Sequence, residues 1–393
     1  MILWILEQMR SLRISFFQGG HTMEKTMLDY IKETPDVLNG IIDHSYEYTK
    51  DLVTFYHDKH CEGIILIASG SSYNGCLMAK PFLKHILGIE VSLYTPFSFL
   101  HHELPFVKNE LLLGVSQSGC STNTLEALKA LKEKGLPCAC LTGRDDCDAR
   151  DIADLTVNWR VGEEKVGFVT KGVSSLACFL MCFALELGKT LGKVSDEKYA
   201  HGKKQLKKTQ QIQPEMLEKT IEVFEENKEL FKGPKRVILL SSGPGYGTAC
   251  EGALKIAETS CIDAFAYEAE EFLHGPIYPS SEDDLFLVID NSDASSSARI
   301  VDIALALQDI SERVFLLSND ERFPQERRFS LSDTTCQHTS VLYKLTCLQA
   351  LSYFMTMQSN RFEPKECVKR FKRANKVASK SREGLYLDLQ KIK

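Results

Sequence analysis

Short apolar runs alternate with longer stretches of helical periodicity along most of the chain. Runs rich in Ile, Leu and Val predict two groups of strands, near residues 64–68, 90–94, 110–115, 138–142 and 155–158, and near 236–241, 263–267, 284–289 and 313–317. Helical periodicity separates them, with long helices near 171–191 and 340–358. Strands that lack polar alternation and are separated by helices are typical of parallel sheets covered on both faces. The pattern predicts an α/β fold of two tandem doubly wound parallel-sheet sandwiches.

The two groups of strands are copies of one another. The segment IILIASGSSYNG, from Ile64, matches VILLSSGPGYGT, from Val237, at an offset of 173 residues. The same offset aligns two further pairs of segments, Phe99–His101 with Phe272–His274 and Leu111–Val115 with Asp284–Val288. Three matches at one spacing indicate an internal repeat.

The repeat divides the chain into a first domain at residues 23–200 and a second domain, with a C-terminal tail, at residues 201–393. The charged stretch 193–214 is the predicted join. Residues 1–22 form a leader whose apolar opening is interrupted by Glu7, so it lacks the longer apolar core of a signal peptide. We assign no function to this leader.

Composition narrows the classes of partner. The 393 residues carry 47 basic and 53 acidic side chains, and this mild acidic excess argues against nucleic acid as the main partner. The longest apolar run, Leu176–Leu185, is far shorter than the roughly 20 residues that span a bilayer, so no membrane partner is expected. The odd number of cysteines, 13, and the missing secretory leader favour reduced thiols and a cytoplasmic location. The pairs Cys138/Cys140 and Cys178/Cys182 lie in apolar runs and are expected in the core, so neither a metal nor another cofactor is predicted.

A cluster of small hydroxyl residues follows the third predicted strand. The apolar run 111–115 leads into Ser116, Gln117, Ser118, Gly119, Cys120, Ser121 and Thr122, and a helix follows. Hydroxyl groups, backbone N–H groups and the helix N-terminus would point at one spot, which predicts an anion-binding loop. An N-capping serine on an ordinary strand–helix connection would give the same local pattern.

The second copy helps to decide between these two interpretations of the serine loop. There the same register reads LVIDNS, residues 287–292, so the serine cluster is lost and an acid enters. A difference between the copies favours a phosphate site in the first copy alone. The turn at Gly70–Tyr73 would border the same crevice, although a tight turn that requires glycine explains it as well.

The second copy carries a different set of chemical groups. Glu251, Lys255 and Glu258 are spaced i, i+4 and i+7, which places them on one helix face. A surface ion pair, common on helices, would have the same spacing. Further on, the sequence EFLHGP holds His274 in a turn stiffened by Gly-Pro. A carboxylate and a histidine suit sugar isomerisation, in which one group moves a proton between adjacent carbons and another assists ring opening or polarises the carbonyl.

The combination of SGSSY, SQSGCST, EGALKIAE and EFLHGP resembles the family of paired sugar isomerase (SIS) domains found in glucosamine-6-phosphate synthase and its relatives. The resemblance covers roughly residues 23–360 and keeps the four motifs in the family's order. It implies that the phosphate and hydroxyl groups of a 6-phosphosugar are bound by Ser72, Ser116, Gln117, Ser118 and Ser121. The stretch VGFVTKG, residues 166–172, resembles the family's backbone contact to the sugar, which we assign to Val169.

The resemblance also implies catalytic roles. Glu258 would shuttle the proton, with Lys255 and Glu251 around it. His274 would catalyse ring opening, in the family typically from a second subunit, which implies a homodimer or a larger even oligomer.

The chain departs from the family pattern in three places. Cys120 stands where the family usually has an acid. The family's C-terminal tail carries a lysine that can form a Schiff base with an open-chain ketose, and here Lys376 and Lys380 are the candidates. Neither Ile2 nor Glu24 is the N-terminal cysteine that the family's glutaminase half uses, so glutamine-dependent synthesis is not expected.

The resemblance therefore implies an enzyme that acts on an amine-substituted ketose 6-phosphate of the fructosamine-6-phosphate type, as a deglycase or deaminase/isomerase. A simple aldose–ketose phosphosugar isomerase is an alternative. A non-catalytic sugar-phosphate sensor is another, but a sensor would have no use for Glu258 and His274 together.

Overall fold

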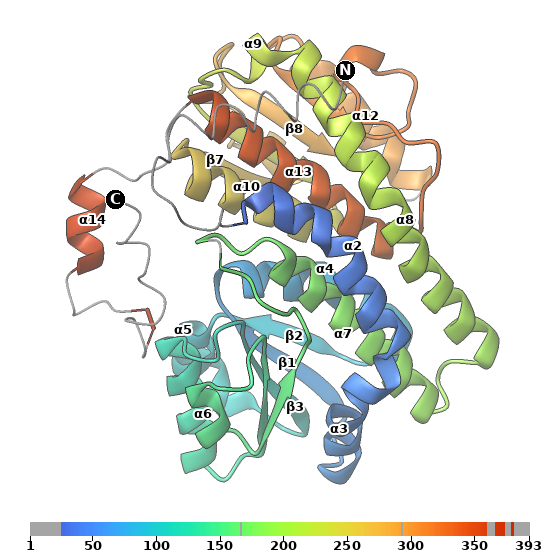
Figure 1. Cartoon of the computed structure of the whole chain (residues 1–393), viewed down its shortest axis with the longest axis vertical. Coiled ribbons are helices and arrows are strands. Elements are labelled where there is room, and N and C mark those ends of the chain that lie inside the picture. The colour runs from blue at the N-terminus through green and yellow to red at the C-terminus, as the bar shows by residue number, and fades with distance from the viewer. Residues whose placement is uncertain (1–24, 166, 292–293, 360–365, 374–378, 381–393) are drawn as a thin grey trace.

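The computed structural model describes residues 25–165, 167–291, 294–359, 366–373 and 379–380 (Figure 1). The leader expected at residues 1–22 lies outside the described residues. The described part of the chain contains two sheets, each made only of parallel strands. The α/β architecture predicted from the sequence is confirmed.

The strands follow the predicted runs closely. The first sheet has the order β2-β1-β3-β4-β5 and comprises β1 (Gly63–Ala68), β2 (Val91–Tyr94), β3 (Glu110–Ser116), β4 (Cys138–Thr142) and β5 (Leu155–Asn158). The second has the order β7-β6-β8-β9 and comprises β6 (Val237–Ser241), β7 (Ala264–Glu268), β8 (Leu285–Ile289) and β9 (Val314–Leu317). The shared order β2-β1-β3 and β7-β6-β8 agrees with the internal repeat.

Helices cover both faces of each sheet. Those of the first half are α2 (Met27–Asp43), α3 (Ser45–Asp58), α4 (Gly70–Leu87), α5 (Pro96–Ser98), α6 (Thr122–Glu133) and α7 (Lys171–Thr190). Those that follow are α8 (Asp196–Glu226), α9 (Lys228–Phe231), α10 (Gly245–Ser260), α11 (Ala269–Leu273), α12 (Ala294–Leu307), α13 (Gln337–Ser359) and α14 (Glu366–Arg373). Helices α4, α7, α10 and α13 lie between the two sheets (Figure 1).

Alternate strand residues point into different clusters, as parallel strands buried on both faces require. In β6, Val237 and Leu239 pack with α10 and α13, whereas Ile238 and Leu240 pack with α11 and α12. The first sheet shows the same division, because one face contacts α4 and α7 and the other contacts α6. Each sheet is therefore the middle layer of a three-layer sandwich.

The two halves are held together by long helices. Helix α8 runs without a break from Asp196 through the rest of the predicted join at 193–214, and Pro214 lies inside it. The boundary expected between residues 200 and 201 thus falls within a helix. Helix α2, which the sequence places in the first domain, contributes Leu38 to the core of the first sheet and Met27 to the core of the second.

Among the described residues, one helix is long and apolar enough to cross a membrane by length and composition, and this is α7. Every residue of its most apolar window is buried inside the fold. Cys178 and Cys182 lie on α7 within the core, and Cys138 and Cys140 are buried in β4, as the sequence predicts.

The register of β8 corrects one detail of the repeat. At an offset of 173 residues Leu111 would match Asp284, but Ile64 pairs with Leu111 whereas the equivalent Val237 pairs with Leu285. The second copy is therefore shifted by one residue at this strand. As a result, Asp290 occupies the place of Ser116 at the carboxyl end of the strand.

Candidate functional site

The serine loop connects β3 to α6 and is tightly folded. The Oγ atom of Ser116 lies 3.0 Å from that of Ser121 and 3.4 Å from that of Ser118. The N–H of Gly119 donates to the Ser116 carbonyl at 2.9 Å, and Gly119 has a φ of +60°, so glycine is favoured here. The three hydroxyl groups converge at the N-terminus of the 12-residue helix α6, where backbone N–H groups and the helix dipole favour an anion.

The turn after β1 lies beside the serine loop because β1 and β3 are neighbours in the sheet. The Asn123 side chain of α6 donates to the Ser69 hydroxyl at 2.9 Å, which links the two loops directly. Gly70 has a φ of +57° and Gly243 one of +51°, so both equivalent turns use a conformation that favours glycine. Ser72, predicted to bind substrate, lies half-buried in the first turn of α4.

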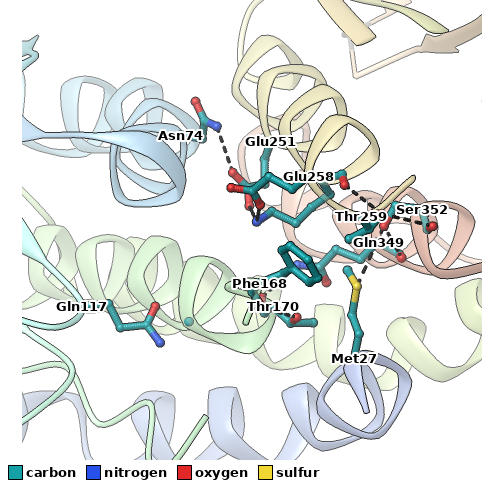
Figure 2. A network of polar contacts seen from close by, with 12 residues as sticks. Met27, Asn74, Gln117, Phe168, Thr170, Glu251, Glu258, Thr259, Gln349 and Ser352 are labelled. Atoms are coloured by element: carbon teal, nitrogen blue, oxygen red, sulfur yellow. Dashed lines mark hydrogen bonds and ion pairs between the residues drawn. The ribbon is translucent and has the colours of Figure 1, made fainter. Parts of the chain in front are cut away.

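The three charged residues of α10 form an internal ion-pair chain, not a surface pair. The side chains of Glu251 and Lys255 are completely buried, whereas that of Glu258 is 37% exposed. Lys255 Nζ lies 3.5 Å from a Glu251 oxygen and 2.5 Å from a Glu258 oxygen. The surface alternative considered from the sequence is therefore wrong, and Lys255 joins a buried carboxylate to an accessible one. Figure 2 shows the side chains of these two carboxylates, Glu251 and Glu258, close to one another.

Burial and pairing both affect the pKa values of this chain of charges. Burial raises the pKa of Glu251 above its ordinary value, and attraction to Lys255 opposes the rise only in part. Burial alone would lower the pKa of Lys255, but the two flanking carboxylates outweigh it and raise that pKa. Lys255 consequently stays protonated and supplies a fixed positive charge next to Glu258.

Helices α4 and α10 join the serine loop of the first copy to the charges of the second. Asn74, in the second turn of α4, donates to a Glu251 oxygen at 2.8 Å, and Ser71 also hydrogen-bonds to Glu251. The repeat relates Asn74 to Gly247 and Glu251 to Met78, and a Cβ atom on Gly247 would indeed meet Met78 at 2.7 Å. The contact between Asn74 and Glu251 and the contact between Gly247 and Met78 are therefore related by the repeat. The first contact is polar and the second is apolar.

The segment before α7 closes another side of the site. The Glu164 carboxylate accepts a hydrogen bond from Gln117 Nε2 at 2.8 Å, which ties this segment to the serine loop. Gln349 of α13 donates to the Thr170 carbonyl at 2.8 Å, and Thr259, next to Glu258, donates to the Ser352 carbonyl of α13 at 3.3 Å (Figure 2). Continuous contacts therefore run from Gln117 to the α10 residue beside Glu258. Val169 lies half-buried within the segment, next to Thr170.

Glu258, expected to transfer the proton, and His274, expected to open the sugar ring, lie on or next to helices that pack on different faces of the second sheet. Phe272 of α11, just before His274, packs on the face of the second sheet formed by Ile238 and Leu240. Ala253 of α10 packs on the opposite face. Helix α11, which precedes His274, and helix α10, which carries Glu258, thus pack on opposite faces of the second sheet, and His274 is exposed.

In the second copy, the residue at the position of Ser116 is held by internal hydrogen bonds. The Asp290 carboxylate accepts from the Ser297 hydroxyl at 2.6 Å and from the Ser318 hydroxyl at 2.8 Å, and Lys344 donates to the Asp290 carbonyl. The position of Ser116 is thus occupied by an acid whose carboxylate already has protein donors. This difference agrees with an anion site in the first copy alone.

Of the two tail lysines considered for a Schiff base, Lys376 and Lys380, it is Lys380 that lies against the serine loop. Its backbone forms an antiparallel bridge with Ser121, and the N–H of Thr122 donates to the Ser379 carbonyl at 3.1 Å. Burial lowers the pKa of Lys380, and the neighbouring Cys120 thiol opposes this shift. Lys376, the other candidate, lies outside the described residues.

Sequence reasoning did not identify Ser71, Asn74 and Glu164 as parts of the site. Ser71 and Asn74 lie in the recognised segment SGSSYN. They are three residues apart, so a helix that begins at Gly70 would place both side chains on the same face, and this spacing could have identified them. No local pattern singles out Glu164, because the groups that it contacts are separated in sequence. Within the described residues, no cluster of three or more His, Cys, Asp or Glu side chains is placed to hold a metal ion.

Comparison with known proteins agrees with this geometry. The family model described as SIS domain matches residues 59–185 and 230–313, which is just over half of the chain and includes all of the first sheet and strands β6, β7 and β8 of the second. The glutamine–fructose-6-phosphate aminotransferase (isomerizing) of Haemophilus influenzae is 31% identical over 266 residues, which cover 65% of this chain and 42% of that protein. The corresponding protein of Vibrio parahaemolyticus is 26% identical over 86% of this chain and 56% of its own length.

A solved structure from Clostridium difficile 630, proposed to be a phosphosugar isomerase, has a TM-score of 0.79 and 25% identity, and covers 88% of this chain and 98% of that one. The two sheets, the matched halves and the serine loop together define the class: this chain belongs to the SIS domain family. It is related to the isomerase half of glutamine–fructose-6-phosphate aminotransferase. The chain spans about half the length of the curated relatives that it matches.

Proposed function

We propose that this protein is an enzyme that converts an amine-substituted ketose 6-phosphate, of the fructosamine-6-phosphate type, into an aldose 6-phosphate and a free amine. The observation that carries the proposal is the charge chain on α10, which places an accessible carboxylate, Glu258, beside a buried lysine, while the buried end of the chain, Glu251, is bonded to α4 of the first copy. A sensor that only binds sugar phosphate gains nothing from a buried lysine that holds this carboxylate.

The proposed reaction begins with the substrate phosphate on Ser116, Ser118 and Ser121, where hydroxyl and backbone N–H groups donate hydrogen bonds. Glu258 removes a proton from C1, the carbon that bears the amine, and the C1–H electrons form a C1–C2 double bond while the C2 oxygen gains a proton. Return of a proton to C2 gives the C1 imine of the aldose phosphate. Water then adds to C1, the carbon–nitrogen bond breaks, and the amine leaves with the remaining proton.

Lys255 has a definite role in this scheme. Because the two carboxylates keep it protonated, it places a fixed positive charge 2.5 Å from a Glu258 oxygen. Gln117 and the backbone at Val169 are proposed to bind the sugar hydroxyl groups, with Ser72 beside them.

We further propose that two chains complete each site. His274 would open the sugar ring, and it follows a helix, α11, that packs on the opposite face of the second sheet from α10, which carries Glu258. A homodimer, or a larger even oligomer, would place His274 of one chain near Glu258 of the other. Lys380 is the candidate for a Schiff base with the open-chain ketose because it lies beside the serine loop. In that variant of the scheme the C2 oxygen leaves as water, the lysine nitrogen takes its place at C2 during the proton transfer, and water releases the lysine afterwards.

The decisive experiment is an NMR screen of fructose 6-phosphates that carry different amines at C1, including amino acids. We expect release of glucose 6-phosphate and the free amine from at least one of them. Interconversion of fructose 6-phosphate and glucose 6-phosphate without any amine substrate would instead support the simple isomerase. Binding of sugar phosphates without turnover of any compound would support the sensor.

A further inference from the structure

Glu164 makes an unusual set of contacts for a residue in a connecting segment. One of its oxygens accepts from the backbone N–H groups of Thr170 at 2.9 Å and Lys171 at 2.8 Å. The other accepts from Gln117 Nε2 at 2.8 Å and from the N–H of Gly172 at 3.3 Å. A single carboxylate therefore holds both the start of α7 and the serine loop.

The Gln117 amide is confined on several sides. A Cβ atom on Gly172 would lie 2.1 Å from Gln117 Oε1, so only glycine leaves room for this amide against α7. The N–H of Gly143 donates to the Gln117 carbonyl at 3.0 Å, and a Cβ on Gly143 would meet the Gln117 side chain at 3.1 Å. Within this confined space, Glu164 is the acceptor that orients the Gln117 amide.

The same carboxylate orients the segment that contains Val169. Hydrogen bonds to Thr170 and Lys171 hold the backbone directly after Val169, and Gln349 holds the Thr170 carbonyl from the other side. The Thr170 hydroxyl also donates to the Phe168 carbonyl at 3.0 Å, so the backbone on both sides of Val169 is fixed.

Only a carboxylate can make all of these contacts. Each of its two oxygens accepts two N–H groups, whereas a glutamine would present its own N–H group to two of these donors. The negative charge is also favourable at the N-terminus of the 20-residue helix α7. A simple helix cap would use only the three backbone contacts, so the bond to Gln117 is the additional observation.

We propose that Glu164 is a positioning residue, which holds Gln117 and the backbone at Val169 in the arrangement that binds the sugar part of the substrate. This inference rests on the proposed function, because it takes a phosphosugar as the ligand. It separates two kinds of binding: the serine loop binds phosphate, and Glu164 organises the groups that recognise the sugar.

The test compares glucose 6-phosphate with inorganic phosphate as calorimetric probes of the full chain. We expect Glu164→Gln to weaken glucose 6-phosphate binding by about 10- to 100-fold, the scale of a charge-assisted hydrogen bond, and to leave inorganic phosphate binding within about twofold. Glu163→Gln is the matched control, because Glu163 is exposed and pairs with Lys165 at 2.8 Å. This control should bind both probes as the wild type does.

A double-mutant cycle makes the positioning role specific. Gln117→Ala should weaken glucose 6-phosphate binding in the wild type but change it by less than about twofold once Glu164 is glutamine. If Glu164→Gln does not fold, Gly172→Ala tests the same arrangement, because its Cβ displaces the Gln117 amide. Unchanged glucose 6-phosphate binding in Glu164→Gln or Gly172→Ala, or additive effects in the cycle, would overturn the proposal. A wild type that binds neither probe would instead overturn the proposed function.

Discussion

At the residue scale, the most informative feature is that Lys255 is buried between two carboxylates. Removing charges from water is costly, and the cost is offset only when opposite charges and hydrogen bonds accompany them. Here Glu251 receives hydrogen bonds from Ser71 and Asn74, while Glu258 reaches the accessible end of the charge chain. The arrangement places a buried positive charge directly beside the accessible carboxylate of Glu258.

The role proposed for Glu258 predicts a loss of turnover without a loss of binding. Glu258→Gln keeps the size of the side chain but cannot accept a proton, so we expect turnover of the amine-substituted substrate to fall by about 10²–10⁴-fold. Affinity for glucose 6-phosphate, measured by calorimetry, should change little. Glu229→Gln is the control, because Glu229 forms an exposed i,i+3 ion pair with Lys232. Full activity of Glu258→Gln would remove this residue from the mechanism and favour the sensor.

The serine loop predicts the opposite pattern, a loss of binding. Replacing both Ser116 and Ser118 with Ala removes two hydroxyl donors, so phosphosugar binding should weaken by about 1–3 kcal/mol. Ser297→Ala in the second copy, where the hydroxyl binds Asp290, should leave that affinity unchanged. Calorimetry that shows equal affinities for the wild type and the double variant would disprove the phosphate assignment.

At the scale of elements, an ion pair links the amino ends of two neighbouring strands, β6 and β8. Arg236, just before β6, donates to both oxygens of Asp284, just before β8, at 3.0 and 2.6 Å. Burial would raise the pKa of Asp284, but the hydrogen bonds from Arg236 and from the Ser281 N–H outweigh it and lower the pKa. The charged form of Asp284 is thus favoured by folding.

The Arg236–Asp284 pair gives a prediction about stability and pH. Arg236→Met leaves a buried carboxylate without its partner and should lower the free energy of unfolding by about 3–5 kcal/mol at neutral pH. Because the folded-state pKa of Asp284 is lowered, the pair's contribution is fully present above the ordinary value of 3.8 and is lost as pH falls through the folded-state pKa. Denaturant unfolding should therefore show that the difference in free energy of unfolding between the wild type and Arg236→Met shrinks as the pH falls through the folded-state pKa of Asp284. A difference that is independent of pH would contradict this account.

At the scale of the whole molecule, the site lies between the two halves of the chain. The first copy supplies the anion loop and the second supplies the charge chain, and α4 and α10 bring them together. The reciprocal crevice has Met78 in place of Glu251 and Asp290 in place of Ser116, so it lacks both kinds of chemistry. The duplication thus leaves the candidate site with one set of these groups and not two.

The separation of His274 from Glu258 predicts complementation between two inactive variants. Homodimers of Glu258→Gln and of His274→Ala should each have little activity. If each site uses Glu258 of one chain and His274 of the other, mixing and reassembling the two should restore about a quarter of the wild-type activity, since half of the dimers are mixed and each has one intact site. Light scattering should show a dimer or a larger even oligomer throughout. Failure of reassembled mixed dimers to regain activity, or an active monomer, would refute the shared site.

Local sequence patterns are sufficient to predict the strands, the main helices and the duplication. These features depend on local periodicity, so the apolar residues of a run such as 237–241 are enough to predict a buried strand there. The sequence also determined that Glu251, Lys255 and Glu258 share one helix face, because the spacing of 3.6 residues per turn is a property of the helix alone. The motif resemblance then led to the SIS domain family, which the comparison confirmed.

The residues that those helix faces contact depend instead on how distant segments pack together. Burial of the α10 charges requires α4, and Glu251 is 177 residues from the Asn74 that it binds, a distance over which no local pattern extends. The one-residue shift at β8 is visible only in the strand pairing. The position of His274 depends on the face of the second sheet against which α11 packs. Glu164 gains its contacts only when α7 and the serine loop meet. Packing between distant segments sets burial, pairing and access, and these determine which charged residues can take part in chemistry.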